Sequence, residues 1–204
     1  MVSDLKLYFR AYGGFLEFLK SYYLWGACAL SLGLYPHWNT SPWWEDVLSI
    51  MPNLLGFSLG GYAMFLAVGD EKFRAILAGK DDDDSEESPF LELNGAFVHF
   101  IIFQIVALFI ALFRQAYDFP ISNDSFLLTL FGDKFSCILI VANFIGYWVF
   151  IYALALALAA TFALLRVGNW YDIYQTHLKG EPDKGNSMAI FKRKLKRKRR
   201  STKR

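Results

Sequence analysis

Three uncharged stretches constrain this chain more than any other feature, because each is long enough to cross a membrane as a helix. They are Val47 to Gly69, Leu93 to Phe113 and Ser136 to Leu165. The hydrocarbon core of a bilayer is ~30 Å thick, and roughly 20 residues of helix span it. Of the 204 residues, 55% are hydrophobic and 18% are aromatic, which is more apolar surface than a soluble domain of this size needs. The sequence predicts an all-α integral membrane protein.

A fourth crossing is predicted at residues 21–37, which is shorter and follows Glu17 and Lys20. Lys20 is able to extend its charged end toward water, so the helix has room to begin earlier. The alternative for this segment is a helix lying at the membrane surface, since residues 5–18 mix apolar and charged side chains. We therefore expect a four-transmembrane-helix bundle. It comprises a domain over residues 1–175, with crossings near 21–37, 47–69, 93–113 and 136–165, followed by a cytoplasmic basic tail over 176–204.

Positive charge is distributed unevenly between the two sides of such a bundle. With four crossings, both termini and the loop between the second and third crossings lie on the same side of the membrane. Most Lys and Arg residues fall on that side, whereas the other side has only Arg114 and Lys134. The positive-inside rule then places both termini and the 70–92 loop in the cytoplasm. That loop begins with Phe73, Ile76 and Leu77 on one side of a short predicted amphipathic helix. An acidic run over 81–87 follows, and its charge disfavours a packed structure.

Small residues recur at helical spacing in two of the apolar segments. In the second crossing they are Gly56, Gly60, Ala63 and Ala67; in the fourth they are Ala142, Gly146, Ala153, Ala157 and Ala160. Small side chains let two helix backbones approach closely, and in lipid this packing replaces the hydrophobic effect as the source of association. We expect a tight helix contact at these faces. The pattern leaves open whether the contact lies within one chain, where the two faces would pair, or between chains of a homo-oligomer.

Four polar side chains fall within the membrane segments: Asn53, His99, Gln104 and Asn143. An unsatisfied amide in hydrocarbon costs several kcal/mol, so each of these groups needs a partner. Gln104 lies near the middle of its helix, which suits either a hydrogen bond between helices or a position along a pore. No Asp, Glu, Lys or Arg lies inside the three long segments, which disfavours an ion-coupled transporter.

The C-terminus is the most basic part of the chain. Ten of the 21 Lys and Arg residues lie between Lys192 and Arg204, which leaves 11 basic against 19 acidic residues in the remainder. The core of this run consists of Lys192, Arg193, Lys194, Lys196, Arg197, Lys198, Arg199 and Arg200. Each cation near an anionic leaflet contributes about 1 kcal/mol, so the lipid bilayer is one partner. A cytosolic protein is a second, and nucleic-acid phosphates are a third.

Enzyme signatures are absent from the sequence. There is no HExxH, GxSxG, P-loop or CxxC motif, and the three histidines, His37, His99 and His177, are widely separated. The acidic pairs at membrane boundaries, such as Glu45 with Asp46, point about 100° apart on a helix and are typical of solvated helix ends. We expect no catalytic residues, no metal site and no cofactor.

The small size, the four predicted crossings, the cytoplasmic termini and the segment MPNLLGFSLGGYA over residues 51–63 resemble small bacterial membrane proteins of defence systems. The resemblance is to the family of KwaA, the membrane component of the Kiwa antiphage system. The resemblance implies a homo-oligomeric sensor in the bacterial inner membrane, working with a cytosolic partner, KwaB, that binds DNA. The basic tail has no counterpart in this resemblance.

Three functional hypotheses follow. A non-enzymatic, oligomeric membrane sensor or scaffold agrees with the small-residue faces and the charged cytoplasmic segments. A small homo-oligomeric channel requires Gln104 and Asn143 to face a common axis. A membrane enzyme requires acids or histidines to converge at one membrane boundary.

Overall fold

The computed structural model describes residue 8 and residues 14–67, 71–78, 88–118 and 134–180, and all regular secondary structure in these ranges is α-helical. Three of the helices are long and apolar enough to cross a membrane: α5 (Trp43–Ala67), α7 (Pro89–Ala116) and α9 (Lys134–Gly180). Helices α7 and α9 contain two of the long stretches identified in the sequence, and α5 contains the first of them as far as Ala67, the last residue described there. The expectation of an all-helical chain is therefore confirmed, and the three long helices are candidate membrane spans.

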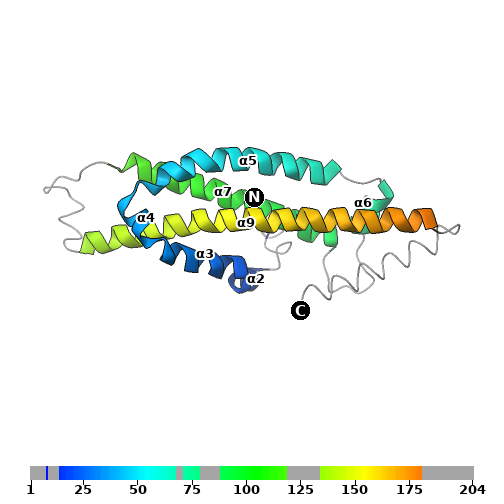
Figure 1. Cartoon of the computed structure of the whole chain (residues 1–204), viewed down its shortest axis with the longest axis horizontal. Coiled ribbons are helices and arrows are strands. Elements are labelled where there is room, and N and C mark those ends of the chain that lie inside the picture. The colour runs from blue at the N-terminus through cyan, green and yellow to red at the C-terminus, as the bar shows by residue number, and fades with distance from the viewer. Residues whose placement is uncertain (1–7, 9–13, 68–70, 79–87, 119–133, 181–204) are drawn as a thin grey trace.

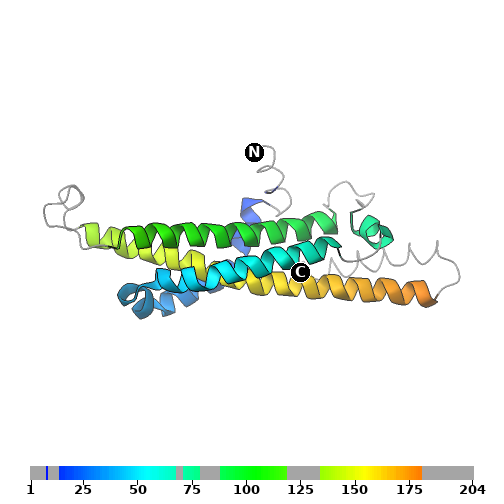
Figure 2. The same cartoon turned by 90° about the horizontal axis from the view of Figure 1, so that it is seen from above.

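The three long helices run side by side along the length of the molecule (Figures 1 and 2). The most extensive contacts join α5 to α7 and α7 to α9, whereas α5 and α9 contact each other less. Val47, Met51, Ser58 and Phe65 are the buried positions that follow one side of α5 at helical spacing. This side of α5 therefore faces the rest of the bundle.

The predicted crossing at 21–37 is not one continuous helix. After the short helix α2 (Phe15–Lys20), the chain forms α3 (Tyr22–Gly33) and then α4 (Tyr35–Thr40), with a break at Leu34. Pro36 lies in the first turn of α4, where its missing N–H interrupts the hydrogen-bond ladder that would join the two helices. The twelve residues of α3 cover about 18 Å, which is shorter than the ~30 Å hydrocarbon core.

Both α3 and α4 pack against α9. Leu24, Ala27 and Ser31 form the buried side of α3. Two indole groups hold this segment in place: Trp148 Nε1 of α9 donates to the Leu24 carbonyl at 3.5 Å, and Trp38 Nε1 of α4 donates to the Ser31 carbonyl at 2.8 Å. The first segment thus packs along α9 as two short helices.

Helix α9 continues well past the apolar segment 136–165 and ends at Gly180, so the predicted domain boundary at residue 175 falls inside a helix. Its last part packs with α6 (Glu71–Ala78), the short amphipathic helix predicted at the start of the 70–92 loop. Phe73 is 1% exposed, and its ring lies 5.1 Å from that of Tyr171 and 5.4 Å from that of Tyr174. Phe73 and Leu77 are buried as the amphipathic pattern predicts, and the side chain of Ile76 lies outside the described residues.

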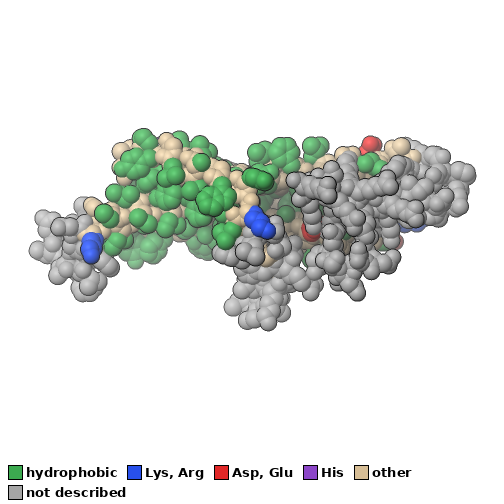
Figure 3. All heavy atoms as spheres, turned by 90° about the horizontal axis from the view of Figure 1, so that it is seen from below, with side chains coloured by type: hydrophobic (Ala, Val, Ile, Leu, Met, Phe, Trp, Pro, Cys, Tyr) green, Lys and Arg blue, Asp and Glu red, His purple; other side chains and the backbone are tan. Residues whose placement is uncertain are grey.

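Charged residues mark two levels along the bundle. On α7, the apolar run lies between Glu92 and Arg114, which are about 33 Å apart along a helix. Arg114 hydrogen-bonds Asn143 of α9, and about 34 Å further along α9 the next charged residue is Arg166. Figure 3 shows hydrophobic side chains filling the surface between two groups of Lys or Arg side chains. A hydrocarbon core of ~30 Å fits between these levels.

Candidate functional site

The small-residue face of α5 is open in this chain. Gly56, Gly60, Ala63 and Ala67 are all exposed. A Cβ atom added to Gly56 or Gly60 would have no heavy atom within 4 Å. Two large apolar side chains of the same helix, Phe57 and Met64, are 77% and 71% exposed beside this face. The face is therefore a shallow apolar surface bordered by larger side chains.

The direction of this face follows from the helical repeat. Residues two positions apart on an α-helix point about 200° apart. Gly56 and Gly60 are each two positions from Ser58, and Ser58 is buried on the side of α5 that packs within the bundle. The small residues therefore lie on the opposite side of the helix from α7.

The small residues of α9 have a different role. Gly146 is buried, and an added Cβ would lie 2.5 Å from Cη2 of Trp43 and 3.0 Å from Cγ2 of Ile110. Ala153 is fully buried, whereas Ala157 is half-buried. Gly146 of α9 thus leaves room for the Trp43 ring of α5. The pairing of the α5 and α9 small faces, one of the options raised by the sequence, is not what the structure shows.

Gln104 joins two helices. It is completely buried, and its Nε2 donates to Ser58 Oγ of α5 at 3.0 Å. Ser58 in turn donates to the Leu54 carbonyl at 2.5 Å. Gln104 Oε1 is buried without a hydrogen-bond partner among the described residues. Of the two roles that the sequence allowed for Gln104, the structure shows the hydrogen bond between helices.

His99 lies in a buried cluster of aromatic side chains. Its Nε2 and the hydroxyl of Tyr152 are 2.9 Å apart, and its Nδ1 is 2.5 Å from the hydroxyl of Tyr8. The rings of Phe18 and Phe103 lie 5.9 and 4.7 Å from the His99 ring. Both ring nitrogens are therefore satisfied by tyrosines from other parts of the chain, which suits a structural histidine.

Asn143 belongs to a polar cluster at the end of the bundle near α4. Its Oδ1 accepts from Arg114 Nε at 3.1 Å and from Trp43 Nε1 at 3.3 Å. The Arg114 guanidinium carbon also lies 4.1 Å from the centre of the Trp44 ring, and its Nη1 is 3.2 Å from Asp118 Oδ1. A guanidinium over an indole ring is a favourable cation–π arrangement. The cluster ties α5, α7 and α9 together.

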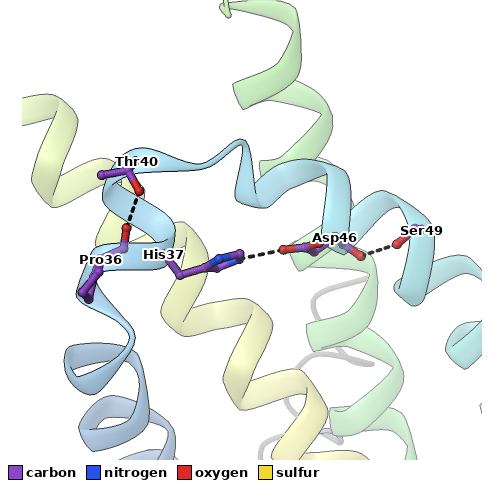
Figure 4. A network of polar contacts seen from close by, with 5 residues as sticks. All are labelled: Pro36, His37, Thr40, Asp46 and Ser49. Carbon is purple, nitrogen blue, oxygen red and sulfur yellow. Dashed lines mark hydrogen bonds and ion pairs between the residues drawn. The ribbon is translucent and has the colours of Figure 1, made fainter.

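The same end of the molecule has a second polar link, drawn in Figure 4. His37 of α4 and Asp46 of α5 point toward one another, with 2.8 Å between Nε2 and Oδ2. The two side chains are 44% and 48% exposed, so solvent weakens the pair. Asn53, the remaining intramembrane polar residue, is exposed and donates to the Ser49 carbonyl of its own helix at 3.2 Å.

The sequence did not reveal the partners in these clusters. Ser58, Tyr152 and Arg114 are ordinary residues in their segments, and each meets its partner across 29 or more positions. Within the described ranges, no group of three His, Cys, Asp or Glu side chains converges in a way that would hold a metal ion. The basic residues from Lys192 to Arg204 lie outside the described residues.

Comparison of the chain with protein-family models, with curated proteins and with solved structures gives no match.

Proposed function

We propose that this protein is a non-enzymatic membrane sensor or scaffold that forms homo-oligomers through the small-residue face of α5. The observation that carries the proposal is the open space beside Gly56 and Gly60, on the side of α5 opposite its packing within the chain. A second helix approaching this face would gain close backbone contact, which is the main source of helix association in lipid.

A sensor also needs a connection between the membrane and the cytoplasm, and α9 supports this part of the proposal. The helix is continuous over 47 residues, and its final part is fixed to α6 by the buried Phe73 and Tyr174 side chains. A shift among the membrane helices would move α6 with α9, because packed aromatic contacts transmit displacement.

The alternative of a homo-oligomeric channel receives less support. It required Gln104 and Asn143 to face a common axis. Gln104 is buried between α5 and α7, and Asn143 accepts hydrogen bonds from Arg114 and Trp43. Both groups are engaged inside one chain, so neither is placed to line a path between subunits.

The proposed topology has four crossings, with α3 and α4 together forming the first, and with both termini in the cytoplasm. In a background where Cys28 and Cys137 are replaced by serine, Ser125→Cys should react with a membrane-impermeant maleimide added outside cells, and Ser85→Cys should react only after permeabilisation. Both positions lie outside the described residues. Labelling of Ser85→Cys but not of Ser125→Cys in intact cells would mean that the true orientation is the reverse of the proposed one.

The basic tail is proposed to act through its charge. Deleting residues 192–204 should leave the oligomer intact and weaken binding to anionic vesicles, acidic proteins or nucleic acid, since each cation near an anionic surface contributes about 1 kcal/mol. Flotation with vesicles of phosphatidylcholine and phosphatidylglycerol, at low and high salt, measures the effect. Binding should also fall with salt, because exposed charges are screened within ~8 Å at physiological ionic strength. Binding that responds to neither deletion nor salt would contradict this role.

The resemblance to the antiphage membrane component extends the proposal to the bacterial inner membrane and to a cytosolic partner that binds DNA. The support is the surface formed by α6 and the end of α9, which would face the cytoplasm and such a partner in the proposed topology. The neighbouring gene tests this extension: a cytosolic DNA-binding protein encoded beside this chain would favour it, and the absence of one would count against it.

Two measurements on the full chain in lipid nanodiscs or liposomes test the proposed function. Native mass spectrometry should give a defined complex of more than one chain. Ion flux in liposomes containing the protein should equal that in empty liposomes. A monomer would contradict the scaffold, and flux above the background would favour the channel.

A further inference from the structure

A cleft of about 490 Å³ lies between the start of α3, the first turns of α7 and residues 156–170 of α9. Glu92 and Arg166 both line the cleft. Each is the charged residue at one end of the apolar run of its helix, so the cleft lies at the end of these runs. The cleft is thus located where the hydrocarbon core meets the headgroup layer, on the α6 side of the molecule.

Positive groups gather at the rim of this cleft. Lys20, the last residue of α2, and Arg166 of α9 both line it, and both side chains are exposed. Glu92 contributes one negative charge, so the described charged lining has two cations and one anion.

The N-terminus of α3 adds hydrogen-bond donors at the same place. Ser21 occupies the capping position, but its side chain makes no capping hydrogen bond. The backbone bonds to the Ser21 carbonyl begin at Leu24 and Trp25, so the N–H groups of Tyr22 and Tyr23 have no acceptor in the described part of the chain. Such N–H groups and the helix dipole favour a bound anion, and phosphate is a frequent occupant of this position.

The remainder of the cleft is largely apolar and opens at the surface of the bundle. Ala159, Ala160 and Ala163 of α9 leave room along one wall. Tyr22 and Phe162, which also line the cleft, are 91% and 51% exposed. His99 lies at the buried end, where both of its ring nitrogens already have tyrosine partners. A ligand here therefore needs an anionic end at Lys20, Arg166 and the α3 N-terminus, and an apolar end along the alanines.

We propose that this cleft binds an anionic phospholipid from the leaflet on the α6 side. The phosphate lies between Lys20, Arg166 and the first N–H groups of α3, and one acyl chain lies along the alanine wall of α9. Basic pockets between membrane helices recognise lipid headgroups by this combination of charge and apolar depth. The proposal does not depend on self-association through α5, which lies on another side of the bundle.

Native mass spectrometry of the full chain in mild detergent tests the site by titration with phosphatidylglycerol, with phosphatidylcholine of the same acyl chains and with glycerol 3-phosphate. The double variant Lys20→Ala/Arg166→Ala removes the two rim cations. Lys72→Ala/Arg74→Ala is the matched control, because it removes two exposed cations of α6 outside the cleft. Ala159→Phe fills the apolar wall without changing any charge.

The wild type should bind phosphatidylglycerol at least about tenfold more tightly than phosphatidylcholine. The Lys20→Ala/Arg166→Ala variant should lose about tenfold in affinity for phosphatidylglycerol, Ala159→Phe should also weaken binding, and the α6 control should stay within about twofold of wild type. Equal binding of both lipids would overturn the proposal. An equal loss in the α6 control would show diffuse charge attraction instead, and displacement of the lipid by glycerol 3-phosphate would identify a site for a free phosphate ester.

Discussion

Replacing Gly146 with alanine is expected to destabilise the bundle by about 1–3 kcal/mol, the usual range for overpacking a well-filled interior. The added methyl group would lie 2.5 Å from one carbon of the Trp43 ring and 2.8 Å from another. Trp43 has little freedom to move, since it is 1% exposed, contacts the rings of Trp44 and Tyr147, and donates a hydrogen bond to Asn143. Thermal unfolding in detergent, followed by far-ultraviolet circular dichroism, measures the loss.

Gly168→Ala is the matched control, because it makes the same change in the same helix. Gly168 is exposed, and an added Cβ there has no heavy atom within 4 Å. Alanine favours the helix by roughly 0.5–1 kcal/mol over glycine, so this variant should unfold at the wild-type temperature or slightly above it. If Gly146→Ala were as stable as Gly168→Ala, the close approach of Trp43 to α9 would be wrong.

The substitution Gly60→Leu is expected to break up the oligomer while leaving each chain folded. Within the chain a side chain at this position enters open space, so folding should be unaffected. Between chains, leucine would hold the two helix backbones apart. A packing penalty of about 1–3 kcal/mol weakens association by roughly 5- to 150-fold. The ratio of oligomer to monomer over a dilution series, measured by native mass spectrometry, reports the change.

Two controls test whether the effect of leucine depends on its position in the small-residue face of α5. Gly26→Leu places the same side chain at an open, exposed glycine of α3, and Leu59→Ala removes bulk from the neighbouring position of α5. Both should keep the wild-type oligomer. A similar loss of oligomer for Gly60→Leu and Gly26→Leu would mean that the effect is not specific to α5.

The three long helices could be predicted from the sequence because runs of more than 20 uncharged residues leave few other structures possible. The structure of the first predicted crossing was harder to predict, because it depends on a local break in the helix. Gly33 and Pro36 flank Leu34, and the chain ends one helix and begins another there. Hydropathy records only that these residues are apolar, and it carries no information on whether the helix continues through them.

The small-residue faces were likewise predicted only in part from the sequence. Their periodicity predicted close approach at Gly56, Gly60 and Gly146, and the structure shows it at Gly146. Periodicity does not say which helix approaches. On α9 the approaching group is a tryptophan from α5, and on α5 the intrachain contacts use the opposite side, with Ser58 and Phe65. These choices depend on the shapes of side chains distant in sequence.

The polar pairs were the least predictable part. The need of Gln104 and Asn143 for partners follows from the cost of burying an amide in hydrocarbon. Their partners, Ser58 and Arg114, follow only from the packing of α5, α7 and α9. The sequence therefore shows which polar groups need a hydrogen-bond partner, whereas the packing of the helices determines which residue becomes that partner.

Disulfide cross-linking in native membranes shows whether the small-residue face of α5 forms an interface between chains. In the background lacking Cys28 and Cys137, Ala63→Cys places a thiol on this face, and Leu158→Cys places one on an exposed side of α9, 53% exposed in the structure. Mild oxidation should convert Ala63→Cys to a covalent dimer and leave Leu158→Cys monomeric. A monomeric Ala63→Cys protein, with a dimer formed through Leu158→Cys, would contradict the account.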